Sequence, residues 1–363
     1  MVKKLLFLNG IAIVAVVLSH SILLAANAPI FWEDLIRDHF PPGYQAMTPF
    51  LNGLFETIFF IDSFCVPVFV FTSGFFVSYS VRNQSRAALF NIYLKRIGVM
   101  LIPYVLWSLV VIGFNTFFDN GNGFFKDLPT ILYGGATDAY YYIFVIIQLY
   151  LLAPFIAGWV IKKPGLMILV GFGLKIGFEI FLMVNQAIHI TTYYVLIRLF
   201  PSLLLYFILG IVFGSNIKRV EKFTIQYRWV NFGLIFLSIL GSFLERYTYW
   251  TVLSIDKGWY PMPISTIVYS FAFICFAMGF PNENLSKSRG LNSLGKSVYA
   301  IFLIHPIAIL VTSKIIYHAA PALIGLPYIF VLILATMGVI LPVILIRLVN
   351  RSPLRKYTAY IFG

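Results

Sequence analysis

Two histidines interrupt apolar stretches of the sequence that are otherwise typical of membrane spans. His20 ends the stretch LNGIAIVAVVLSH (residues 8–20), and His305 lies within SVYAIFLIHPIAIL (residues 297–310). A polar group inside a membrane span is costly and tends to mark a functional site. Because a neutral imidazole, with an ordinary pKa of about 6.5, accepts a proton at physiological pH, each histidine is a candidate general base.

His20 does not stand alone on its helix. Asn9 precedes it by about three helical turns, so the two side chains share one face. This polar stripe must face the interior of a helix bundle or a water-filled cavity rather than lipid. Two interpretations are open for His20: a general base, or an imidazole that only hydrogen-bonds a neighbouring helix.

His305 is followed directly by Pro306. A proline within a helix removes a backbone donor and bends the helix, which frees a carbonyl group beside the imidazole. Such a kink suits a functional site, and it also suits ordinary packing, so both interpretations stay open.

Two pairs of charged side chains within the predicted spans are candidates for a structural or functional role. Lys175 and Glu179 are spaced i, i+4, so we expect them to pair, most simply as a structural clasp. Glu56 and Asp62 stand in the outer part of the second predicted span, where they can line the outer end of a substrate cavity.

The connection VRNQSRAALFNIYLKRIGVMLIPY (residues 81–104) concentrates basic side chains: Arg82, Arg86, Lys95 and Arg96. A basic rim of this kind can hold a phosphate-bearing molecule. It is also the charge that a cytoplasmic loop of a membrane protein normally carries.

The segment from about residue 27 to residue 53 is the longest connection on the predicted outer side. It contains Trp32, Glu33 and Asp34. Aromatic faces and carboxylates together suit a bound saccharide, but the same residues also suit a packed cap with Trp32 at the level of the lipid headgroups.

The composition determines which elements must position these residues. The chain has 363 residues, of which 60% are hydrophobic and only 11% charged. Apolar windows of about 20 residues recur along it, which predicts an all-α polytopic membrane bundle. We expect about ten spans in a single domain of residues 1–363, at 5–26, 54–80, 98–118, 140–161, 164–184, 195–215, 229–248, 263–281, 297–316 and 325–346.

The charges predict the orientation of these spans. Most of the 26 Lys and Arg residues fall at one set of ends and loops, and this bias places both termini in the cytoplasm. The formal charge of +13 is therefore a matter of topology, and we expect no nucleic-acid partner. The two cysteines form no disulfide framework or metal pattern, and we expect no metal.

The first apolar stretch also resembles a secretory leader, because Lys3 and Lys4 precede it and AANAP (residues 25–29) follows. Pro29 would hinder cleavage after that site, and the stretch is long enough to span a membrane. We therefore expect a retained first helix, which keeps His20 in the protein.

Five blocks of the sequence resemble, in the same order, the motifs of a known family. The blocks are LNGIAIVAVVLSH, PVFVFTSGFFVSYS, YLKRIGVMLIPYVLWSL, YYIFVIIQLYLLAPF and SLGKSVYAIFLIHPI. Together they resemble the acyltransferase-3 family of integral membrane acyltransferases, in particular the short members encoded with polysaccharide intercellular adhesin synthesis.

The matching positions in these blocks are His20, Gly74, Phe75, Ser78, Arg96, Gln148, Tyr150, Pro154, Gly295, Ser297, Tyr299 and His305. Two family arginines are replaced, one by Asn9 and one by Val99. The family uses these positions to hold or orient its donor, and Lys95, Arg82 or Arg86 can substitute for the second.

The resemblance implies a bacterial plasma-membrane enzyme that moves an acyl group, most simply acetyl, from cytoplasmic acyl-CoA to a saccharide hydroxyl on the outer side. It implies His20 as the base that accepts the hydroxyl proton. Ser78, Tyr150 and His305 are the candidates that stabilise the oxyanion, and direct transfer and an acyl-histidine intermediate are both open.

Two other classes of protein fit the same residues. A multi-pass exporter of a glycan or small solute would use the Lys175–Glu179 pair and the intramembrane histidines for proton coupling. A membrane subunit without chemistry is the third interpretation. The sequence makes no prediction of the oligomeric state.

Overall fold

The protein is built from helices, as its composition predicts. The computed structural model describes residues 2–41, 44–81, 84–118, 123–188, 196–252, 263–281 and 288–363. These residues form α-helices and short 3-10 helices, and no strand occurs among them. The prediction of an all-α fold is confirmed.

An apolar helix corresponds to each of the predicted spans, but only some of these helices are long enough to cross a membrane. Within the described residues, eight are long and apolar enough by length and composition: Val2–Ala28, Pro49–Ser80, Arg86–Phe118, Phe124–Lys162, Pro164–Asn185, Arg228–Thr251, Val298–Ala319 and Pro327–Arg351. The predicted spans 195–215 and 263–281 appear as the shorter apolar helices Leu204–Ser215 and Ile264–Met278. The polytopic architecture is therefore confirmed.

The backbone packs into two compact units, each assembled from three segments of the chain. Unit 1 comprises Met1–Ala12, Ser63–Gly98 and Tyr140–Lys296, and unit 2 comprises Ile13–Asp62, Val99–Ala139 and Ser297–Gly363. Two long helices, α1 (Val2–Phe31) and α5 (Arg86–Phe118), begin in unit 1 and continue into unit 2.

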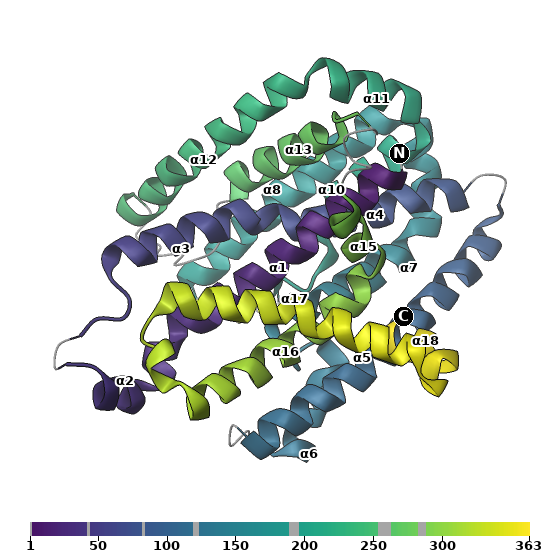
Figure 1. Ribbon diagram of the computed structural model, residues 1–363. Coiled ribbons are helices and arrows are strands. Elements are labelled where there is room, and N and C mark those ends of the chain that lie inside the picture. The colour runs from purple at the N-terminus through teal and green to yellow at the C-terminus, as the bar shows by residue number, and fades with distance from the viewer. Residues whose placement is uncertain are drawn as a thin grey trace. The chain divides into compact units, whose positions relative to one another are not determined.

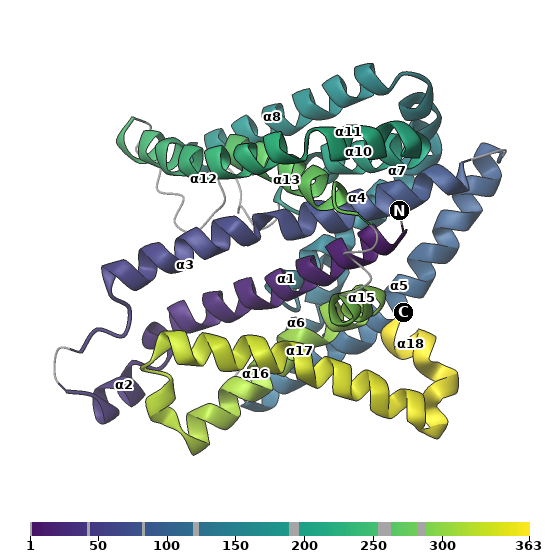
Figure 2. The same ribbon diagram turned by 45° about the horizontal axis from the view of Figure 1, so that its top comes forward.

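Unit 1 is centred on α10, which packs against three neighbours, α4, α7 and α8 (Figure 1). The two helices α12 and α13 run side by side in the same unit (Figure 2). Its helices are α4 (Cys65–Ser80), α7 (Tyr141–Lys162), α8 (Pro164–Ile188), α10 (Leu204–Ser215), α11 (Ile217–Gln226), α12 (Arg228–Thr251), α13 (Pro263–Met278) and α15 (Arg289–Lys296), with the 3-10 turn η4 (Phe200–Ser202).

Glycines let α4 and α10 pack with their backbones in contact. A Cβ atom at Gly210 would collide with the carbonyl oxygen of Phe71, and one at Gly74 would collide with that of Phe207. Small residues at such crossings allow the close approach on which membrane helices depend for packing. Gly74 of the second block therefore has a structural explanation.

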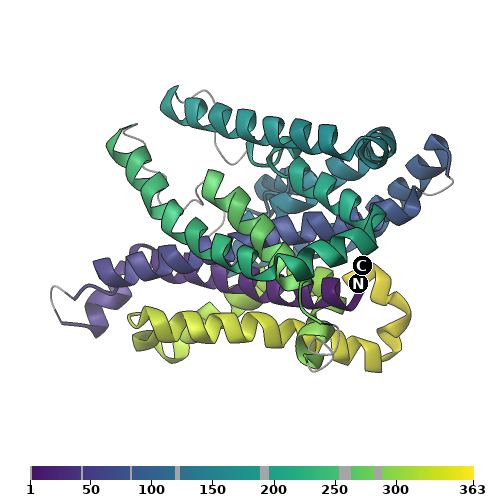
Figure 3. The same cartoon turned by 90° about the horizontal axis from the view of Figure 1, so that it is seen from above.

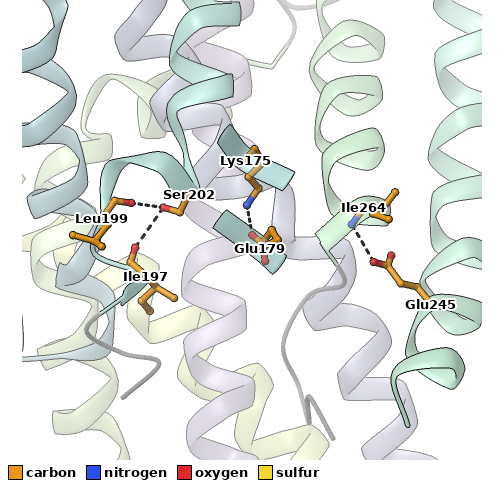
Figure 4. A network of polar contacts seen from close by, with 7 residues as sticks. All are labelled: Lys175, Glu179, Ile197, Leu199, Ser202, Glu245 and Ile264. Carbon is orange, nitrogen blue, oxygen red and sulfur yellow. Dashed lines mark hydrogen bonds and ion pairs between the residues drawn. The ribbon is translucent and has the colours of Figure 1, made fainter. Parts of the chain in front are cut away.

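Two polar contacts within unit 1 join charged side chains to their partners. Lys175 and Glu179 form the expected i, i+4 ion pair on α8 (Figure 4). The carboxylate of Glu245 on α12 accepts hydrogen bonds from the backbone N–H groups of Ile264 and Ser265, at 3.1 and 3.0 Å. Because first-turn N–H groups have no partner within their own helix, Glu245 acts as an interhelical cap of α13.

Unit 2 contains α2 (Glu33–His39), α3 (Pro49–Ile61), α6 (Phe124–Asp127), α16 (Val298–Ala319), α17 (Pro327–Arg351) and α18 (Thr358–Phe362). The 3-10 turns η2 (Leu128–Tyr133), η5 (Pro321–Leu323) and η6 (Pro353–Tyr357) belong to it, and η1 (Asp62–Phe64) and η3 (Asp138–Tyr140) lie at its borders. The helices α16, α17 and α18, coloured yellow-green to yellow, lie together (Figure 3).

Prolines set the starts of four long helices. Pro49, Pro164, Pro263 and Pro327 are the first residues of α3, α8, α13 and α17. Proline suits this position because its fixed φ is helical and its missing N–H would have had no partner within the helix. The side chain of Thr48 also caps α3, where it accepts a hydrogen bond from the N–H of Leu51.

The substitution Gly210→Ala tests the close packing of α4 and α10. We expect it to lower the thermal unfolding midpoint in detergent and to cost about 1–3 kcal/mol, because the added methyl group meets backbone that must move. Gly173→Ala on α8 is the matched control, since its Cβ would have no atom within 4 Å. Equal midpoints for the two variants would contradict the packing.

Candidate functional site

Unit 2 brings the two candidate histidines together. The ring centroids of His20 on α1 and His305 on α16 are 5.2 Å apart, with an angle of 49° between the ring planes. His305 has no solvent-exposed surface, whereas His20 is half-buried. We call these residues the imidazole pair. Its two members lie far apart in the sequence, and neither apolar block alone predicts the contact.

A backbone hydrogen bond determines which nitrogen of His305 carries its proton. Nδ1 lies 2.7 Å from the carbonyl oxygen of Phe302. Because a carbonyl oxygen can only accept, Nδ1 must donate, and in the neutral ring Nε2 is then an unprotonated acceptor. Nε2 is buried and has no hydrogen-bond partner among the described residues.

The carboxylate of Asp62 is bonded to the residue that precedes His20. The hydroxyl group of Ser19, the residue before His20, donates a hydrogen bond of 3.1 Å to Oδ2 of Asp62. Asp62 is only 6% exposed. Asp62, the acid expected in the outer part of the second span, is thus bonded to α1 through Ser19, which directly precedes His20.

Asp138 is a residue that the sequence reasoning missed. It lies in unit 2 at the start of η3 (Asp138–Tyr140), and its charge interacts with His20. Its only sequence signal was a lone acid before an aromatic run, in GGATDAYYY (residues 134–142).

Unit 1 assembles a second group of predicted residues, which we call the Arg96 cluster: Ser80, Tyr93, Arg96 and Tyr150. The guanidinium group of Arg96 donates a hydrogen bond of 3.2 Å to Ser80 and lies 5.5 Å from the ring centroid of Tyr93. The ring of Tyr93 stacks on that of Tyr150, with 5.6 Å between the centroids and 10° between the planes. The structure therefore groups Tyr150 with Arg96.

The other predicted basic residues surround this cluster only in part. Arg86 and Lys95 lie on α5 and are exposed, whereas Arg96 is half-buried. Arg82 lies outside the described residues. Among the described basic residues of this block, Arg96 is thus the cation held in a defined position by hydrogen-bonding and aromatic partners.

Ser78 has a bond within its own helix. Its hydroxyl group donates to the carbonyl oxygen of Phe75 at 2.8 Å, and its side chain packs where a Cβ at Gly214 would be. It is 1% exposed. These contacts explain the residue by helix packing, and its expected role at an oxyanion stays a prediction.

Asn9 ties two helices together within unit 1. Its Oδ1 atom accepts a hydrogen bond of 3.1 Å from the hydroxyl group of Thr72 on α4, and both residues are buried. The polar stripe of α1 therefore faces protein at this end, as the sequence predicts.

The predicted acceptor residues differ in their surroundings. Trp32 is half-buried and lies 5.7 Å from the ring of Tyr317, with the ammonium group of Lys314 5.9 Å from its own ring centroid. Glu33 is exposed on α2, and the side chain of Asp34 lies outside the described residues. Glu56 on α3 accepts a hydrogen bond of 2.9 Å from Asn52. The packing of Trp32 suits a cap, and the saccharide role of these residues stays a prediction.

Lys4 is not the exposed topological charge that its position near the N-terminus indicates. It is 1% exposed, and its ammonium group contacts Oε1 of Glu221 at 3.2 Å and the carbonyl oxygen of Met278 at 2.8 Å. The start of α1 is thus held by α11 and α13. A charge pattern cannot predict this ion pair, because its partners lie more than 200 residues apart.

Comparison with known protein families assigns the chain to a family over nearly its whole length. The family model of the acyltransferase domain, acyltransferase-3, matches residues 5–347. The chain belongs to the acyltransferase-3 family. The resemblance predicted from the sequence blocks is thereby confirmed. No curated protein matches the chain, and no solved structure matches it either.

The matched region of this acyltransferase contains both the imidazole pair and the Arg96 cluster. The glycines of its second and fifth blocks serve packing, since a Cβ at Gly295 would meet the backbone of Leu6 just as one at Gly74 would meet Phe207. After these structural residues are set apart, the histidines and the Arg96 cluster remain as the groups suited to chemistry.

The variant Thr72→Val tests whether Asn9 depends on its hydrogen bond. We expect a loss of about 1–3 kcal/mol in stability, because a buried acceptor would lose its donor. Thr312→Val is the control: Thr312 is equally buried, but its hydroxyl group bonds Ala308 of its own helix. Thermal unfolding in detergent measures both, and a smaller loss for Thr72→Val than for the control would refute the tie.

Proposed function

We propose that this acyltransferase moves an acyl group, most simply acetyl, from cytoplasmic acyl-CoA to a hydroxyl group of an extracytoplasmic saccharide or cell-envelope glycan. The observation that carries the proposal is the imidazole pair, a buried proton acceptor within a chain of this family. We further propose that residues 1–363 work as one domain in a bacterial plasma membrane, with both termini in the cytoplasm.

His20 is the general base of the proposed reaction. The acceptor hydroxyl gives its proton to His20 as its oxygen attacks the thioester carbon. The new C–O bond forms, the C–S bond breaks, and the proton passes to the leaving thiolate. Ser78 and Tyr150 stay candidates for the oxyanion.

The Arg96 cluster is the proposed contact for an anionic part of the donor. A guanidinium group presents several donors in a planar fork that suits phosphate oxygens. Its bond to Ser80 and its position over Tyr93 hold that fork in one orientation. Arg86 and Lys95 on the same helix would add to the positive charge of this segment, Arg82 stays a candidate from the sequence, and no metal is needed for the reaction as proposed.

An exporter of a glycan or solute is the competing proposal. Its main sequence support was the Lys175–Glu179 pair, whose members neutralise each other on one helix. Purified protein incubated with labelled acetyl-CoA and an oligosaccharide acceptor separates the two proposals. Release of CoA with label on the acceptor supports acyl transfer, and flux into vesicles without CoA release supports export.

We expect His20→Ala to lower the rate of CoA release by about 10²–10⁴-fold, the usual contribution of a general base, with membrane insertion intact. His318→Gln is the control, because His318 is an exposed histidine at the end of α16. A His20→Ala enzyme with the same kcat as the parent protein rules out this residue as the base.

We expect Arg96→Ala to raise the KM for acetyl-CoA about 10- to 100-fold with a smaller change in kcat, since a charge-assisted hydrogen bond contributes about 1.5–3 kcal/mol. Lys222→Ala, which removes an exposed cation from α11, should change neither constant. Steady-state kinetics decides, and a fall in kcat alone would place Arg96 away from the donor.

A further inference from the structure

The dipeptide His305–Pro306 joins a buried imidazole to an unusual carbonyl group. In an α-helix the N–H of residue i bonds the carbonyl of residue i−4. For Pro306 that carbonyl belongs to Phe302, but proline has no N–H to donate. The helix α16 continues through this position from Val298 to Ala319, so the Phe302 carbonyl lacks its normal helical donor.

The side chain of His305 supplies the missing donor. Its Nδ1–H bonds the Phe302 carbonyl at 2.7 Å, deep in the protein. Because a buried carbonyl without a donor costs about 1–3 kcal/mol, this bond favours the ring form in which Nδ1 carries the proton. The same bond fixes the orientation of the ring.

The consequence is a buried nitrogen that can only accept. In the neutral ring Nε2 of His305 has a lone pair and no hydrogen-bond partner among the described residues. The ring centroids of His20 and His305 are 5.2 Å apart, and no hydrogen bond joins the two rings in this structure. At that separation, a rotation of the His20 side chain would be enough to direct one of its nitrogens at Nε2. The rings of Phe302 and His20 are both aromatic neighbours of His305, and of these only His20 carries a polar N–H.

We propose that His305 is the positioning residue of His20, and that Pro306 sets this role by freeing the Phe302 carbonyl. His305 accepts an N–H of His20 through Nε2, which leaves the other nitrogen of His20 unprotonated and directed at the acceptor hydroxyl. When His20 takes up the proton, the same bond stabilises its charged ring. In many enzymes a carboxylate orients the catalytic histidine. In this arrangement a neutral imidazole, that of His305, would do so instead.

This inference rests on the proposed function for its kinetic consequence, but the proton position can be measured without turnover. In ¹⁵N-histidine-labelled full-length protein, we expect the NMR spectrum of His305 to show a protonated Nδ1 and an unprotonated Nε2. The loss of one signal set in a His305→Gln variant assigns the resonance. A wild-type spectrum with the proton on Nε2 would overturn the proposal.

The variant Pro306→Ala tests whether the proline determines the proton position on His305. It restores a backbone N–H at residue 306 that competes for the Phe302 carbonyl. We expect the His305 spectrum to move toward a mixture of both proton positions, and kcat to fall about tenfold with an unchanged KM for acetyl-CoA. Pro342→Ala on α17 is the matched control, because it also removes a proline from within a helix but no histidine follows or precedes it. An unchanged spectrum in Pro306→Ala would refute the role of the proline.

The acceptor role is tested separately by two substitutions of His305. His305→Leu removes the acceptor and should lower kcat by about 10- to 100-fold with KM unchanged, whereas His305→Gln keeps an acceptor oxygen and should recover part of the rate. Equal rates for the Leu and Gln variants would contradict the proposal. If the wild-type protein releases no CoA from acetyl-CoA, the proposed function is wrong. The NMR experiment still decides whether His305 carries its proton on Nδ1, because it needs no turnover.

Discussion

Inside a bundle of apolar helices, a polar group cannot form hydrogen bonds with water, so its hydrogen-bond partner must come from the protein. The hydrogen bond from His305 to the Phe302 carbonyl is the clearest case. The Nδ1–H group of the buried ring needs an acceptor, and the carbonyl needs a donor in place of the one that Pro306 lacks. The proline removes one donor and the imidazole restores one. Together with the 5.2 Å separation of the His20 and His305 rings, this exchange is the basis of the positioning role that we propose for His305.

Most other buried polar side chains of the described residues serve structure. Some bond within their own helix, as the hydroxyl groups of Ser78 and Thr312 do. Others tie neighbouring helices together, as Lys4 does with Glu221 and Thr72 with Asn9. Nε2 of His305 is one of several buried side-chain atoms without a hydrogen-bond partner among the described residues, and the ring of a second histidine, His20, lies beside it. That neighbour gives the unpartnered nitrogen a chemical explanation.

The sequence predicted the helices well because span length and apolar composition are local properties. It also predicted the Lys175–Glu179 pair, which needs only one helical turn. It did not predict that His20 meets His305 or that Lys4 meets Glu221, because such contacts depend on how distant helices pack. The freed carbonyl beside His305 was visible in the dipeptide His–Pro, but the ring nitrogen that would bond it was not.

Burial of the imidazole pair also bears on the choice between acyl transfer and hydrolysis. A thioester reacts with water if a base activates a water molecule beside it, and exclusion of water from an active site prevents this side reaction. His305 has no exposed surface, whereas His20 is half-buried, so the imidazole pair is closed to solvent on the side of His305. If His20 is the base of acyl transfer, as proposed, the packing that buries His305 would also keep water away from this side of the thioester. Stability and chemical selectivity would then have one cause.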